Sequence, residues 1–127
     1  MASKGSKPTI LIVDDDPYIR KMLAEVLGLE GYPYETATNG QEALEALDHS
    51  GPRLILLDLL MPVVDGRGVM TQLRASPEVR ARHKVVLVSA NDRLEAARDL
   101  EPDSMLAKPF TADQLLNVIE TTSADFS

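Results

Sequence analysis

The chain has 127 residues, carries a formal net charge of −7 and contains no cysteine. This length suits one domain with a substantial core, and the acidic charge argues against charge-driven binding of nucleic acid or anionic membranes. The lack of cysteine excludes disulfides, thiolate metal sites and thiol nucleophiles.

The first third of the chain predicts alternating strands and helices behind a leader. Residues 1–7 lack the long apolar stretch of a signal peptide, so we expect a flexible leader there. The continuous apolar run at 9–13 indicates a strand covered on both faces. Apolar residues recur at helical spacing over 17–28 and over 40–48, with a weaker strand predicted between them at 34–37.

The rest of the chain continues this alternation. Two further runs, LILL and VVLVS, are apolar without interruption, and a weaker strand is predicted nearer the C-terminus. Segments with helical spacing of apolar residues follow each of them. The pattern predicts strands at 54–57, 85–89 and 104–107, helices over 66–75, 92–99 and 111–121, and a tail at 122–127.

Five successive strand–helix pairs predict an α/β fold. Connections of this length imply right-handed crossovers, and therefore a doubly wound parallel sheet with helices on both faces, in three layers αβα. In such folds, ligands bind beyond the carboxyl ends of the strands. The residues that follow the predicted strands are therefore the first candidates for a functional site.

Polar side chains follow four of the five predicted strands. They are Asp14, Asp15 and Asp16 after the first, Asp58 after the third, Ser89 at the end of the fourth and Lys108 after the fifth. Because parallel strands end at one edge of the sheet, we expect carboxylates, a hydroxyl and an ammonium group to gather in one site.

Carboxylates gathered in this way need a cation, because they would otherwise repel one another or take up protons. Oxygen ligands without His or Cys favour a hard ion, Mg²⁺ or Mn²⁺, over Zn²⁺. Bound Mg²⁺ commonly pairs with phosphate, so the expected guest is a phosphoryl group. Lys108 would neutralise one phosphoryl oxygen, Ser89 would hydrogen-bond another, and Asp58 is the candidate nucleophile.

Four motifs in order, ILIVDDDP, LILLDLLMPVVDG, VVLVSA and LAKPF, resemble those of the receiver domain of two-component response regulators. The similarity extends roughly over residues 8–121, and it is specific because each motif closes a strand. The resemblance implies a flavodoxin-like (βα)5 fold with five parallel strands in the order 2-1-3-4-5.

The resemblance also implies roles for single residues. Asp58 would be the phospho-acceptor, Asp15 a direct metal ligand, and Asp14 a ligand acting mostly through water. The implied Mg²⁺ ligands are Asp14, Asp15, Asp58 and the backbone carbonyl of Leu60. The implied catalytic partners of Asp58 are Ser89, which is also a switch residue, and Lys108. The Lys108–Pro109 peptide bond is expected to be cis.

By the same resemblance, the phosphoryl donor is a phosphohistidine on a sensor histidine kinase or a histidine phosphotransfer protein. The domain would catalyse only its own phosphorylation and dephosphorylation, so we do not expect an enzyme with external substrates. Phosphorylation would alter the face of the fourth helix, fifth strand and fifth helix, which a downstream protein target or an output domain reads. We expect a cytoplasmic, bacterial protein with no direct contact to nucleic acid or membrane.

The main departure from the family lies three residues before Lys108. An aromatic residue usually occupies this switch position, but here it is Met105, which is flexible and has no ring or hydroxyl. An alternative interpretation is therefore an interaction module of the same fold that does not switch by phosphorylation. A third is a phosphatase with an aspartate nucleophile, which the Asp14 and Asp16 spacing allows but the following Pro17 disfavours.

Several polar residues need no chemical role. Asp16 precedes a proline and is predicted to cap the first helix. Asp65 is predicted to start a helix after a turn. His49 and His83 are expected at the surface, and the basic run at 80–84 is expected in a solvated loop.

Overall fold

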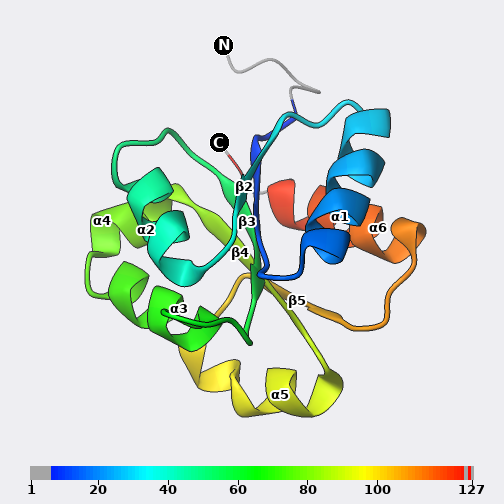
Figure 1. Ribbon diagram of the computed structural model, residues 1–127. Coiled ribbons are helices and arrows are strands. Elements are labelled where there is room, and N and C mark those ends of the chain that lie inside the picture. The colour runs from blue at the N-terminus through cyan, green and yellow to red at the C-terminus, as the bar shows by residue number, and fades with distance from the viewer. Residues whose placement is uncertain (1–6, 125, 127) are drawn as a thin grey trace.

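The structure is a computed structural model that describes residues 7–124 and 126. A five-stranded parallel sheet in the order β2-β1-β3-β4-β5 forms its centre, and helices cover both faces (Figure 1). The strands are β1 Ile10–Val13, β2 Tyr34–Ala37, β3 Leu54–Asp58, β4 Lys84–Ser89 and β5 Ser104–Ala107. The helices are α1 Pro17–Leu29, α2 Gly40–Asp48, α3 Gly66–Arg74, α4 Pro77–Arg82, α5 Asn91–Ala96, the 3-10 helix η1 Arg98–Leu100 and α6 Ala112–Ser123. The predicted fold and strand order are confirmed.

Two hydrophobic cores flank the sheet, because successive side chains of a strand point to opposite faces. Ile10 and Leu54 pack with α1 and α6 on one face. Leu11 and Ile55 pack with α2, α3 and the α5–η1 segment on the other. Burial of each such side chain stabilises the fold by about 1.5–3 kcal/mol. Coverage of both faces explains why the strands are continuous apolar runs.

The predicted helix starts are confirmed by their caps. The Asp16 carboxylate accepts a hydrogen bond of 2.9 Å from the backbone N–H of Tyr18, the second residue of α1. Asp65 accepts one of 2.8 Å from the N–H of Gly68 at the start of α3. Thr111 and Gln114 form a reciprocal capping box before α6. Each cap satisfies backbone donors that the first helical turn leaves unpaired.

The basic run before β4 is not a solvated loop, and this prediction was wrong. Residues 80–82 form the end of helix α4, which begins at Pro77 because proline suits the first position of a helix, and Lys84 begins β4. His83 is also not at the surface, since only 1% of it is exposed. The backbone N–H of Arg53 donates a hydrogen bond of 3.0 Å to His83 Nδ1. His49 is exposed, as predicted.

Two helix bounds also differ from prediction. The helix predicted over 92–99 divides into α5 and η1, because the N–H of Ala97 bonds the carbonyl of Leu94 three residues back and tightens the turn. The last helix continues to Ser123, since Thr122 is buried and shares a hydrogen bond of 2.7 Å with Ser104 on β5. Of the predicted leader, residues 1–6 lie outside the described residues, as do residues 125 and 127 of the predicted tail.

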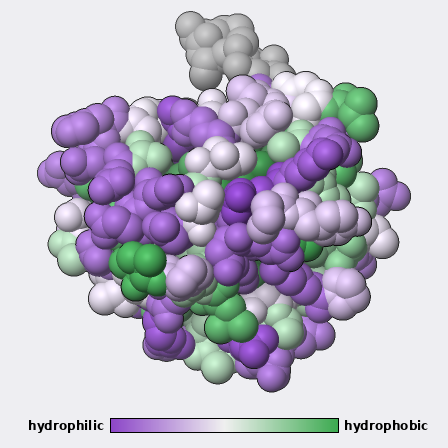
Figure 2. All heavy atoms as spheres, in the orientation of Figure 1, coloured by the Kyte–Doolittle hydropathy of each residue, from purple (hydrophilic) through white to green (hydrophobic). Residues whose placement is uncertain are grey.

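The surface is predominantly polar on the face seen in Figure 2, where hydrophobic side chains are scattered among hydrophilic ones. Within the described ranges, no helix combines the length and the apolar character needed to cross a membrane.

Candidate functional site

Three carboxylates from two neighbouring strands meet at the carboxyl edge of the sheet. Asp14 follows β1 and Asp58 ends β3, and these strands are direct neighbours. One carboxylate oxygen from each of Asp14, Asp15 and Asp58 lies within 4.8 Å of the others. Asp14 and Asp58 are buried, whereas Asp15 is exposed. The predicted acidic cluster is therefore formed.

Lys108 and Ser89 complete the group from the other side. The Lys108 Nζ atom lies 3.4 Å from Asp14 Oδ2 and 3.7 Å from Asp58 Oδ1. The backbone N–H of Lys108 donates a hydrogen bond of 2.8 Å to the carbonyl of Ser89, which holds the ends of β4 and β5 together. All five predicted side chains thus line one cavity of about 630 Å³, whose wall also includes Asp16, Pro17, Leu60, Ala90 and Arg93.

Backbone contacts fix the two buried acids. The Asp14 Oδ1 atom accepts a hydrogen bond of 2.9 Å from the N–H of Asp16, and Asp58 Oδ1 accepts one of 3.3 Å from the N–H of Leu60. Behind Asp58, Gly66 allows close packing, because a Cβ atom there would lie 2.5 Å from the carbonyl oxygen of Asp58. The glycine therefore lets α3 begin directly against the strand that carries this acid.

The loop between β3 and α3 holds an unfavourable backbone conformation beside the site. Val63 has a φ of 69° and is 80% exposed. A β-branched residue in the left-handed region is strained, and such strain gathers at functional sites. Leu60, in the same loop, is 52% exposed and lies at the cavity wall. The loop thus presents one apolar side chain, Leu60, next to the acids.

The electrostatics of the site favour a bound cation. Burial raises the pKa of the Asp58 carboxyl, and the negative charge of Asp14 raises this pKa further. The ammonium group of Lys108 acts in the opposite direction but does not cancel these effects. A divalent cation between the carboxylates would stabilise the ionised form of Asp58 in place of a proton.

The donor set fits Mg²⁺. Hard, oxygen-only ligands suit Mg²⁺ or Mn²⁺, and Mg²⁺ typically uses one or two carboxylates and keeps several waters. Asp14, Asp15 and Asp58 supply the carboxylates. Leu60 lines the same cavity, and the role of its backbone carbonyl as a metal ligand stays a prediction. The structure therefore contains a site that could bind a divalent cation.

Met105 and Arg93 lie differently with respect to the acidic cavity. Met105 on β5 pairs in register with Leu87 and packs partly buried against the core, so it lies outside the acidic cavity, and its predicted switch role stays a prediction. Arg93 on α5 lines the cavity but was missed in the sequence. The sequence signal that could have identified Arg93 is its place in the first turn of the helix that follows Ser89, close to the end of β4.

The Asp16 carboxylate lines the cavity too but is engaged as the α1 cap. This contact disfavours the alternative in which Asp14 and Asp16 form the nucleophile motif of a phosphatase.

Comparison with protein families gives a match over nearly the whole fold. A family model described as the response regulator receiver domain matches residues 10–120. The chain is 36% identical over 109 residues to the probable transcriptional regulator ycf27 of Porphyridium aerugineum, covering 86% of this chain and 45% of that protein. It is also 36% identical to the response regulator MprA of Mycobacterium sp. (strain KMS), covering 84% and 46%.

The chain thus spans less than half the length of these curated relatives. They include plastid-encoded as well as mycobacterial proteins, so the expected bacterial source stays a prediction.

Solved structures show the same fold. The signal receiver domain of a signal transduction histidine kinase from Syntrophus aciditrophicus is 28% identical, with a TM-score of 0.86 over 94% of this chain and 92% of that one. The response regulator TrrA from Thermotoga maritima, solved in complex with Mg²⁺ and BeF, is 32% identical, with a TM-score of 0.79 over 91% and 98%.

Proposed function

The chain belongs to the response regulator receiver domain family, and from this premise we propose that Asp58 accepts a phosphoryl group from a phosphohistidine. The donor would be a sensor histidine kinase or a histidine phosphotransfer protein. One observation carries the proposal: Asp14, Asp15 and Asp58 converge within 4.8 Å, and Lys108 Nζ lies 3.7 Å from Asp58. With a bound cation and Lys108, this group of acids can stabilise a phosphoryl group on Asp58, whereas an isolated surface carboxylate cannot.

The proposed transfer uses the residues at the carboxyl edge in distinct roles. An Asp58 carboxylate oxygen forms a bond to phosphorus while the phosphorus–nitrogen bond to histidine breaks, and the electron pair of that bond returns to the imidazole. Mg²⁺, when bound by the acids, neutralises charge on the transferring group. Lys108 neutralises one phosphoryl oxygen and the Ser89 hydroxyl donates a hydrogen bond to another.

Loss of the phosphoryl group would follow by attack of water on phosphorus, which releases phosphate and restores the Asp58 carboxylate. Leu60, exposed at the cavity wall, would limit the approach of that water by excluding it from one side. The domain then acts only on its own phosphoryl group, so we propose a signalling protein rather than an enzyme with external substrates.

The proposed output is a change in the face formed by α5, β5 and α6, which a downstream protein or an output domain would recognise. Ser89 and Met105 lie on the two strands that adjoin this face. The methionine favours a second candidate function, an interaction module that binds its partner without a phosphorylation switch. The cytoplasmic location stays a prediction, as does the absence of direct contact with nucleic acid or membrane.

The test is incubation with acetyl phosphate and Mg²⁺, followed by intact-mass measurement. We expect the mass of one phosphoryl group to be added in an acid-stable, base-labile form. No phosphoryl group should be added when EDTA is present from the start. Asp58→Asn should not be modified. Asp65→Asn is the matched control, because it removes an acid of the same loop while asparagine keeps the helix cap. Equal modification of Asp58→Asn and wild type would contradict the assignment.

A further inference from the structure

Arg93 occupies the partition between two cavities at the carboxyl edge. It lines the acidic cavity with Asp58, Ser89 and Lys108. It also lines a second cavity of about 200 Å³ between the β3–α3 loop and α5. Leu60 is the other residue that contributes to both. The Arg93 side chain therefore has space on either side, one towards the acids and one away from them.

Arg93 differs from neighbouring arginines in having no fixed partner. Within residues 7–124 and 126, it takes part in none of the ion pairs. It is exposed. By contrast, Arg67, Arg74 and Arg98 are each paired with a carboxylate. A free guanidinium beside an anion site can reorient at little cost when a new acceptor is introduced there.

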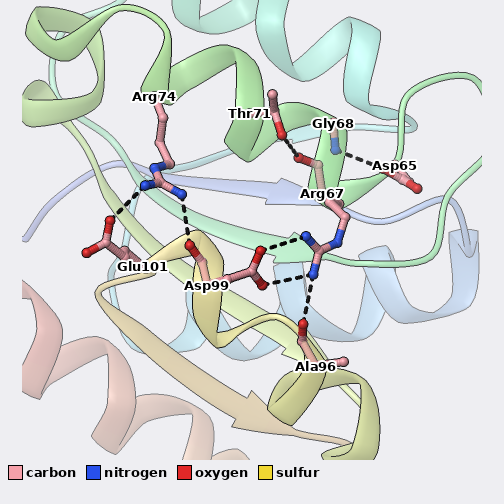
Figure 3. Close-up of polar contacts among 8 residues, drawn as sticks. All are labelled: Asp65, Arg67, Gly68, Thr71, Arg74, Ala96, Asp99 and Glu101. Atoms are coloured by element: carbon pink, nitrogen blue, oxygen red, sulfur yellow. Dashed lines mark hydrogen bonds and ion pairs between the residues drawn. The ribbon is translucent and has the colours of Figure 1, made fainter.

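The opposite end of the same helix is held firmly (Figure 3). From α3, Arg67 makes two contacts of 3.0 Å with the Asp99 carboxylate and donates 2.8 Å to the carbonyl of Ala96, the last residue of α5. Arg74 donates 2.9 Å to the carbonyl of Asp99 and 2.7 Å to the Glu101 carboxylate. The C-terminal end of α5 is thus clamped to α3, while Arg93 lies in the first turn.

Phosphorylation would leave the site with excess negative charge. An acyl phosphate carries up to about two negative charges, and Asp14 and Asp15 add one each. Lys108 and a divalent cation offset three of these four charges. Arg93 is a further cation on the cavity wall that could offset the remaining one, and guanidinium groups match phosphoryl oxygens well.

We propose that Arg93 is the phosphoryl-sensing residue that couples Asp58 to α5. Its guanidinium donates hydrogen bonds to the phosphoryl group on Asp58 and draws the N-terminal end of α5 towards the site, while the Arg67 clamp acts as the pivot. This inference rests on the proposed function of Asp58. It gives the chain a route from phosphorylation to the α5–β5–α6 face that needs no aromatic ring at Met105.

The test uses beryllofluoride with Mg²⁺ as a phosphoryl mimic, with binding followed by calorimetry and by NMR of labelled protein. Arg93→Ala should weaken beryllofluoride binding about tenfold or more, as expected for loss of one charge-assisted hydrogen bond. Arg93→Lys should recover part of this loss. Arg98→Ala is the matched control, since it removes a cation from the η1 end without touching either cavity, and it should bind as wild type does.

Two further readouts separate sensing from folding. Mg²⁺ alone should bind Arg93→Ala as tightly as wild type or more tightly, because a repelling cation is gone, whereas a folding defect would weaken it. Beryllofluoride should shift the amide signals of Asn91 and Leu94 in wild type but much less in Arg93→Ala. If Arg93→Ala binds beryllofluoride as wild type does, or shows the same shifts in α5, the role of Arg93 is overturned while the proposed function of Asp58 stands. If the wild-type chain does not bind beryllofluoride, the proposed function fails and the inference fails with it.

Discussion

The two ends of the sheet differ in how their charged side chains are arranged. At the carboxyl end, Asp14, Asp15 and Asp58 crowd together with Lys108 as the nearby ammonium. At the amino end, several basic groups instead have a fixed hydrogen-bond acceptor. The Arg80 guanidinium bonds Asp103 at 3.0 Å, and other contacts there bind Arg53 to Glu35 at 2.9 Å and Arg82 to the carbonyl of Ser50 at 2.9 Å.

The difference indicates which end stabilises the fold and which end could bind a cation. The contacts of Asp103 at the amino end join α4, β4 and the start of β5. Unbalanced carboxylates at the carboxyl end cost stability until a cation arrives. Sites of this kind commonly trade stability for function. The comparison predicts that mutations at the two ends have effects of opposite sign.

The largest effect should come from Asp58→Asn. We expect beryllofluoride affinity to fall by more than about a hundredfold, since the bond-forming oxygen is lost. The metal-free variant should nevertheless be more stable than wild type at neutral pH, because a buried carboxylate whose pKa is raised by burial and by Asp14 is removed. Urea denaturation with EDTA measures this gain. A variant less stable than wild type would show that the acids do not repel one another.

The amino end should respond to Asp103→Ala with a large loss of stability. The Asp103 carboxylate accepts hydrogen bonds from Arg80 at 3.0 Å and from the N–H of Val85 at 2.8 Å. Their loss leaves partly buried donors unpaired, and we expect about 2–3 kcal/mol of destabilisation by urea denaturation. Asp48→Ala, at an exposed carboxylate, is the control and should change little. Unchanged stability in Asp103→Ala would refute a structural role for this end.

The buried His83 should make the amino end sensitive to acid. Burial, together with the positive charges of Arg82, Arg53 and Arg80, lowers the pKa of His83 to about 4. The unfolded chain then binds a proton that the folded chain does not, so stability present above pH 6.5 is lost as the pH falls towards 4.

The measurement for this residue compares wild type with His83→Asn, which keeps an acceptor for the N–H of Arg53. Wild type should lose about 1–2 kcal/mol more than the variant between pH 7 and pH 5. Parallel stability curves over this range would contradict a depressed His83 pKa.

The smallest effect should come from Val63→Gly in the loop beside the acids. Glycine adopts a positive φ without a Cβ clash, and the exposed valine buries little surface. After the larger entropy of the unfolded glycine chain is deducted, a gain of about 0.5–1 kcal/mol should remain. Val63→Ala should gain less, since alanine keeps the Cβ. Thermal denaturation of both variants checks the order, and a less stable glycine variant would exclude strain at this position.

The site at the carboxyl end could be predicted from the sequence, because its residues directly follow the predicted strands. Unbroken apolar runs located the strands, and parallel pairing then required Asp14, Asp58 and Lys108 to meet. Local signals also located the caps, since Asp16 and Asp65 precede helical patterns directly.

The amino end was not predictable because its contacts join residues far apart in the sequence. His83 is buried by a partner at Arg53, 30 residues away, and no local pattern announces that contact. The same limit applies to the clamp from Arg67 to Asp99 across 32 residues. Composition alone suggested a solvated basic run, whereas tertiary pairing made it part of the folded structure.

The most direct test of the central claim is a crystal structure of the chain with Mg²⁺ and beryllofluoride. The account predicts a beryllium–oxygen bond to Asp58, a metal ion held by Asp15 and Asp14, and Lys108 against a fluoride. A metal ion bound elsewhere, or beryllofluoride absent from Asp58 in crystals that hold both reagents, would contradict it.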